Sequence, residues 1–87
     1  MKTIWKVQLW NQNSNLIKVS LPSKAKFLSV QMQNDLPVAW FLVETENAAV
    51  ERHFRIYGTG WPIDEANLNY LGTIQDRSGF VWHVMEI

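Results

Sequence analysis

The chain has 87 residues, with eight basic and eight acidic side chains, no cysteine, and 47% hydrophobic residues. This length suits one domain over residues 1–87, and the lack of cysteine excludes disulfides. Balanced charge argues against polymeric nucleic acid or an anionic membrane as the main partner. No apolar run approaches the roughly 20 residues that span a bilayer, and His53 and His83 alone fall short of a structural zinc site. We therefore expect a soluble cytoplasmic protein without a metal or other cofactor.

The first part of the chain shows three stretches of alternating apolar and polar residues, at 3–9, 15–22 and 26–33. In the first stretch, Trp5, Val7 and Leu9 alternate with polar neighbours such as Lys6 and Gln8. A period of two places one set of side chains inward and the other toward water. Each stretch therefore predicts a half-buried β-strand.

The stretch 36–44 is apolar on both of its faces, which predicts a central or doubly covered strand. Asn34 and Asp35, just before it, tolerate positive φ and predict a tight hairpin turn. Residues 45–51 are polar and predict a loop, and a fifth strand follows at 52–58.

The last third of the chain predicts a hairpin formed by strands at 69–75 and 79–87. A short helical turn capped by Asp64 is expected within 63–69. Short strands at intervals of about ten residues are typical of all-β domains. We expect an all-β fold, a small antiparallel barrel or sandwich of about seven strands, with at most one short helical turn.

The stretch "YGTGWPID" is the main candidate for a ligand-binding loop. Gly58 and Gly60 allow backbone amides to approach a ligand closely, and Thr59 adds a hydroxyl. Trp61 offers an aromatic face for stacking, and Asp64 ends the stretch. The alternative is a plain turn between strands, because neither a third glycine nor a lysine completes a phosphate-binding motif.

The strand that precedes this loop adds candidate residues. Arg55 and Tyr57 alternate with the apolar Phe54 and Ile56, so both are expected on the outward face. There, Arg55 could pair with a phosphate and Tyr57 could stack on a ring. A solvated strand face is the simpler alternative.

His83 is the remaining candidate binding residue, on a strand whose two faces are both apolar. This position favours hydrogen-bonded packing, or an interface with a second subunit, over catalysis. No cysteine, serine elbow or positioned carboxylate pair accompanies the histidines. We therefore expect a protein that is not an enzyme.

Three segments of the chain resemble a family of small proteins of unknown function, found mostly in bacteriophage genomes. The segments are "LPSKAKFLSVQMQNDLPVAWFLV", "RIYGTGWPID" and "YLGTIQDRSGFVWHVMEI". The resemblance spans nearly the whole chain and implies a phage accessory protein with a compact β fold. It implies no activity and assigns no functional residues.

Together, the loop and the resemblance lead us to expect a phage accessory protein in the cytoplasm of the infected bacterial host. It would counter host defence by sequestering a small nucleotide-like ligand in pockets of a homo-oligomer. Two alternatives stay open, namely an inhibitor that binds a host defence protein directly and a structural or virion-associated protein.

Overall fold

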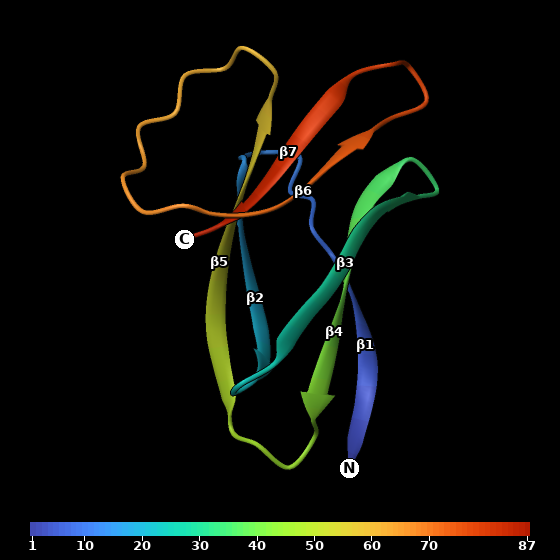
Figure 1. The fold of residues 1–87 in the computed structure, drawn as a ribbon, viewed down its shortest axis with the longest axis vertical. Helices are drawn as coiled ribbons and strands as arrows, with labels where there is room; N and C mark the ends of the chain where they lie inside the picture. Colours follow the sequence, from blue (N-terminus) through green and yellow to red (C-terminus); the bar gives the residue numbers. More distant parts are fainter.

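The computed structural model describes residues 1–87 and contains seven strands and no helix (Figure 1). The all-β expectation is therefore confirmed. The strands are β1 (Lys2–Gln8), β2 (Leu16–Pro22), β3 (Lys26–Gln33), β4 (Leu36–Glu44), β5 (Ala49–Gly58), β6 (Asn69–Gln75) and β7 (Val81–Glu86). With no helix at all, the structure offers no apolar helical segment long enough to cross a membrane.

The strands form two antiparallel sheets, one with the order β1-β4-β3 and one with the order β2-β5-β7-β6. The β3–β4 hairpin turns at Asn34 and Asp35, whose φ angles are 51° and 62°. Positive φ at both central residues is the geometry that suits the twist of a hairpin, so the predicted tight turn is confirmed.

The core lies between the two sheets and follows the predicted alternation. Phe41 of β4 and Phe54 of β5 are both fully buried, with ring centroids 6.0 Å apart in an edge-to-face arrangement. Leu9, Leu21, Ile56 and Val84 add further side chains with almost no exposed area. Strand β4 lies in the middle of its sheet, as its two apolar faces predicted.

Two expectations about local structure are wrong. Strand β5 begins at Ala49 rather than at residue 52, because β2 pairs with it along its whole length, from Leu16 opposite Arg55 to Pro22 opposite Ala49. Residues 63–69 form no helical turn, so Asp64 caps no helix. Glu65, in the middle of this segment, is ion-paired with Arg55, a long-range contact that a helical pattern could not indicate.

Candidate functional site

Arg55 alternates with the buried Phe54 and Ile56 and is partly exposed, as the alternation predicted, whereas the expected exposure of Tyr57 is wrong. Arg55 does not present a free guanidinium. Its Nη2 donates to Glu65 Oε1 at 2.9 Å, and its Nη1 donates to Asn15 Oδ1 at 3.1 Å. Tyr57 is 5% exposed and offers no open ring face. The outer face therefore carries a satisfied ion pair and no open phosphate site.

His83 lies beside Tyr57 on the same outer face and takes part in a chain of hydroxyl groups. Its Nε2 is hydrogen-bonded to Thr59 Oγ1 at 2.8 Å, and its Nδ1 to Thr73 Oγ1 at 3.0 Å. Tyr70 continues the chain, with its hydroxyl 2.6 Å from Thr73 Oγ1. Both ring nitrogens are occupied by hydroxyls, and neither contacts a carboxylate. The carboxylate that orients the histidine in a Ser-His-Asp triad has no counterpart in this chain of hydroxyls.

Trp61 lies apart from Arg55 and His83 and packs against two other tryptophans. Trp82 is the central ring, with its centroid 5.5 Å from that of Trp61 and 6.0 Å from that of Trp10. Both pairs meet edge to face, at 89° and 79°. The three indoles come from β7, the β5–β6 connection and the β1–β2 connection, which occupy the half of Figure 1 away from the N-terminus.

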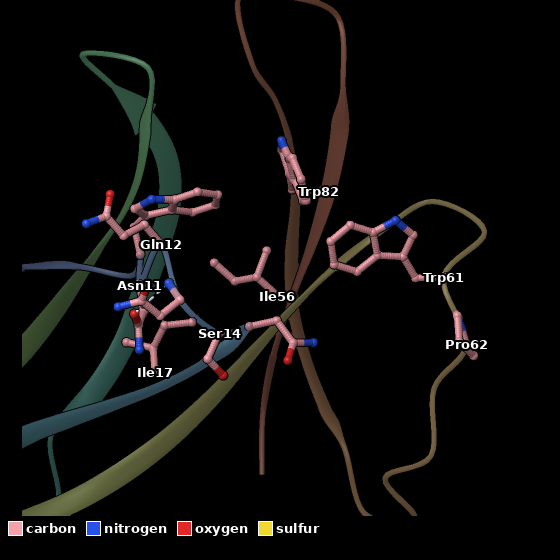
Figure 2. A pocket seen from close by; sticks show the side chains of 11 residues that line it. Asn11, Gln12, Ser14, Ile17, Ile56, Trp61, Pro62 and Trp82 are labelled. Carbon is pink, nitrogen blue, oxygen red and sulfur yellow. Dashed lines mark hydrogen bonds between the residues drawn. The ribbon is translucent and has the colours of Figure 1, made fainter.

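The three tryptophans border a cleft of about 500 Å³, which we call the tryptophan cleft. Figure 2 shows the indole of Trp61 reaching from its loop toward Trp82, with Ile56 between Trp61 and the segment that carries Asn11 and Gln12. The lining residues are Trp10, Asn11, Gln12, Asn13, Ser14, Asn15, Ile17, Ile56, Trp61, Pro62 and Trp82, none of them charged. Apolar rings thus form one part of the wall and neutral polar side chains the other.

A second hollow of about 520 Å³ adjoins the cleft and shares Trp61 and Trp82 with it. Gly58, Thr59, Gly79, Phe80 and Val81 complete its lining. The side chain of Phe80 is 65% exposed at this site. The Trp61–Trp82 pair therefore separates two neighbouring hollows.

The glycines of the predicted loop shape the position of Trp61. A Cβ on Gly58 would lie 2.8 Å from the indole of Trp61, which is closer than real Cβ contacts allow. Gly60 has φ of 89°, a conformation that glycine adopts without strain. The first glycine makes room for the ring, and the second allows the chain to turn and bring Trp61 back over Gly58.

Asp76 holds the central indole in place. Trp82 Nε1 donates to Asp76 Oδ2 at 3.0 Å, while Asp76 Oδ1 accepts from the backbone N–H groups of Ser78 and Phe80. The hydrogen bond from Trp82, supported by these backbone donors, holds the pKa of Asp76 below its usual value. The charged carboxylate of Asp76, which is not among the residues that line the cleft, therefore holds the indole of Trp82 in its orientation.

The polar wall of the cleft comes from residues 11–15, which sequence reasoning left unassigned. Asn11 Oδ1 accepts from the backbone N–H of Asn13 at 3.0 Å, a turn that asparagine commonly forms. Ser14 Oγ accepts from the backbone N–H of Leu16 at 3.0 Å, and Asn15 is held by Arg55. The signal that could have indicated this wall is the run "NQNSN", directly after Trp10.

Of the residues predicted as a ligand site, Trp61 alone lines the cleft. Arg55 donates a hydrogen bond to Asn15, which lines the cleft, and Gly58 leaves space for the indole of Trp61. The others, Tyr57, Thr59, Gly60, Asp64 and His83, lie outside it. No three residues among the histidines, aspartates and glutamates are grouped closely enough to hold a metal ion.

The fold and the cleft define a small two-sheet β protein with an aromatic cleft between loops at one end. The family model described as a domain of unknown function, DUF7352, matches residues 1–87. The chain therefore belongs to this family. No curated protein and no solved structure matches the chain.

Proposed function

We propose that the chain is a non-catalytic binding protein that sequesters a small nucleotide-like ligand in the tryptophan cleft. The observation that carries this proposal is the meeting of three indoles around a cleft of about 500 Å³. That volume suits a small ligand. Stacking of one base on an aromatic ring stabilises binding by roughly 1–3 kcal/mol, and it tolerates different bases.

Two hydrogen bonds support a ligand site here because they fix wall residues from outside the cleft. Asp76 holds Trp82, and Arg55 holds Asn15. A wall that is fixed before binding loses less conformational entropy when the ligand enters. Arg55 therefore has a positioning role in this proposal, in place of the direct phosphate contact expected from the sequence.

The absence of catalysis in this proposal rests on the surroundings of His83. In the Ser-His-Asp triad, a carboxylate orients the histidine and stabilises its charged form. The two partners of His83 are threonine hydroxyls, and no carboxylate contacts its ring. This arrangement favours a structural role for the hydroxyl chain that includes Thr59, Thr73 and Tyr70.

The biological part of the proposal rests on the sequence resemblance alone. We propose a phage accessory protein that removes a nucleotide signal from the host's defence, acting in the cytoplasm of the infected cell as a homo-oligomer. Sequestration by mass action requires only affinity and abundance, so a binding cleft without catalytic groups suffices.

A second candidate function is direct binding of a host defence protein. It is favoured by an apolar area on the face of β1 and β4 that points away from the other sheet. Ile4 is 56% exposed there, opposite Leu42 and close to the half-buried Trp40. Specific capture of one host protein, lost on Ile4→Lys, would favour this candidate over sequestration.

The proposed function is tested by titrating the purified protein with AMP, GMP, CMP and UMP while following tryptophan fluorescence. We expect at least one of the four to bind, and Trp61→Ala to weaken its binding about 5- to 150-fold, the loss of one stacking contact. The matched control is Trp5→Ala, since Trp5 has a similar exposed fraction, 40% against 49%, but lies on β1 outside the cleft.

Native mass spectrometry of the untagged protein reports the subunit number and any ligand retained from the cell. A nucleotide-sized adduct that is present in Trp5→Ala and lost in Trp61→Ala would support the proposal. If none of the four nucleotides binds and no adduct is retained, sequestration of a nucleotide is contradicted.

A further inference from the structure

Strand β1 forms a free edge of the three-stranded sheet, because it pairs with β4 alone (Figure 1). The two ends of this pairing show which backbone groups face β4. Thr45 N–H donates to the Met1 carbonyl, and Leu9 N–H donates to the Pro37 carbonyl. In an antiparallel strand, the backbone groups of successive residues point to alternate sides, so the odd-numbered residues of β1 face β4. The residues whose N–H and C=O groups face outward are Lys2, Ile4, Lys6 and Gln8.

The other three edge strands of the molecule are less open to a further strand. Strands β3 and β6 each contain a register shift, and a Cβ on Gly72 of β6 would lie only 2.6 Å from Val30 Cγ1 of β3. Strand β2 ends with Pro22, whose nitrogen faces outward, since the next residue, Ser23, donates its N–H to the Ala48 carbonyl. Bulges and prolines protect sheet edges from pairing. Strand β1 has neither, and its seven residues keep an uninterrupted register.

Lysine is a further residue that protects sheet edges, and β1 carries Lys2 and Lys6. Lys6 Nζ donates to Gln33 Oε1 at 2.6 Å, so this side chain reaches across β4 to β3 and directs its charge away from the edge. Lys2 lies opposite Glu44 of β4. The two lysines therefore restrict the register of a further strand and do not close the edge.

The lysine positions select one register for a second copy of β1. Since only outward-facing groups can form new hydrogen bonds, even-numbered residues must lie opposite even-numbered ones. A twofold axis at Ile4 places Lys2 opposite Lys6 of the second copy, and an axis at Lys6 places the two Lys6 side chains opposite each other. Like charges directly opposite are destabilising. An axis at Trp5 pairs all seven residues, with Lys6 opposite Ile4 and Lys2 opposite Gln8 of the second copy. Strand β1 is thus complementary to itself in its register of full length.

We propose that two copies of the chain associate through antiparallel pairing of their β1 strands, with Trp5 on the twofold axis. The outward-facing residues form four pairs that exchange about eight backbone hydrogen bonds, two for each pair. Trp5, which is 40% exposed in the single chain, lies directly opposite its counterpart, with the Cα atoms about 4.5 Å apart. Aromatic cross-strand pairs of this kind stabilise a sheet.

This interface goes beyond the proposed function, because it supplies a specific contact between copies and joins the two three-stranded sheets into one. None of the residues that line the tryptophan cleft belongs to β1, so each cleft stays complete within its own copy. Dimerisation and nucleotide binding can therefore be measured separately.

The test measures the dimer dissociation constant by sedimentation of the purified chain over a range of concentrations. Because Gln8 lies opposite Lys2 of the second copy, Gln8→Glu creates two opposite-charge pairs in the dimer, and Gln8→Lys creates two like-charge pairs. We expect Gln8→Glu to strengthen dimerisation and Gln8→Lys to weaken it, each about 2- to 30-fold. Adding Lys2→Glu to Gln8→Lys should recover the lost affinity, since the pairs then carry opposite charges again.

The matched controls are Gln31→Glu and Gln31→Lys. Gln31 is exposed and lies opposite Val38, as Gln8 does, but on β3, away from the free edge. Both controls should leave the dissociation constant unchanged. A chain that stays monomeric at every concentration would overturn this interface. A dimer that ignores the Gln8 variants, or that responds equally to the Gln31 variants, would also overturn it.

Trp5→Ala separates this inference from the proposed function. It removes the aromatic pair on the axis, so it should weaken dimerisation and leave nucleotide binding unchanged. Undiminished dimerisation of Trp5→Ala would contradict the register proposed here. Failure of all nucleotides to bind, with dimerisation as expected, would contradict the proposed function alone.

Discussion

Asp76 is the residue on which the orientation of the central indole depends, through the 3.0 Å hydrogen bond from Trp82. Its pKa is lowered in the folded protein, so the ionised carboxylate is the form that folding favours. Its contribution to stability is complete above the ordinary aspartate pKa of about 3.9 and is lost as the pH falls through the lower folded value.

This linkage predicts the behaviour of Asp76→Asn. The variant should be less stable than the wild type at neutral pH, and the difference should shrink when the pH falls below about 4. Chemical unfolding followed by tryptophan fluorescence between pH 2 and pH 7 would measure it. A difference that stays constant over this range would contradict the role assigned to the ionised carboxylate.

The residue-level predictions from sequence were right about strand faces and incomplete about the cleft. The outward position of Arg55 follows from simple alternation with Phe54 and Ile56, so it could be predicted, but alternation alone did not indicate that Tyr57 is buried. The pairing of Arg55 with Glu65 and Asn15 could not, because it joins three separate segments. The sequence of a motif does not indicate whether its basic side chain is already paired with a carboxylate of the same protein.

At the scale of elements, Arg52 ties strands β5 and β7 to the residue that precedes β3. Its Nε and Nη2 donate to the two carboxylate oxygens of Glu86, at 2.6 and 2.7 Å, and its Nη1 donates to the Ala25 carbonyl. The hydrogen bonds to Glu86 raise the pKa of Arg52, and the guanidinium lies 5.3 Å from the ring centre of Phe41. Both side chains of the pair are mostly buried, at 21% and 16% exposed.

Glu86→Gln should lower the free energy of unfolding by about 1.5–3 kcal/mol, because a mostly buried arginine keeps its charge and loses a charged, two-oxygen partner. Urea unfolding would measure this. The control Glu51→Gln removes the same charge from an exposed pair with His53 and should change the unfolding midpoint little. If the two variants were equally stable, the Arg52–Glu86 pair would have no special role in joining the elements.

The elements themselves were largely predictable, since strands β3, β4 and β6 begin and end where the alternation indicated. The connections were not. Residues 59–68 carry no periodic pattern, and their course depends on contacts such as that of Glu65 with Arg55. The β1–β2 connection was overlooked because a polar run between strands is typical of any surface loop.

For the whole molecule, the cleft exists because the β1–β2 and β5–β6 connections meet strand β7 at one end of the two packed sheets. Trp10, Trp61 and Trp82 lie far apart in the sequence. The fold brings the ring centroids of Trp10 and Trp61 to 6.0 and 5.5 Å from that of Trp82. Among the tryptophans, the sequence predicted a binding role for Trp61 only. Which of them lie together depends on sheet order, and the order β2-β5-β7-β6 was not predictable from the strands alone.

The most direct test of this account uses the five tryptophans as internal reporters. Each indole N–H gives its own signal in a nitrogen–proton correlation spectrum, and single substitutions assign the signals. On titration with UMP, we predict that the signals of Trp10, Trp61 and Trp82 shift together and saturate, while those of Trp5 and Trp40 stay in place. Saturable shifts confined to Trp5 and Trp40, or no saturable shift at any indole, would contradict a ligand site in the tryptophan cleft.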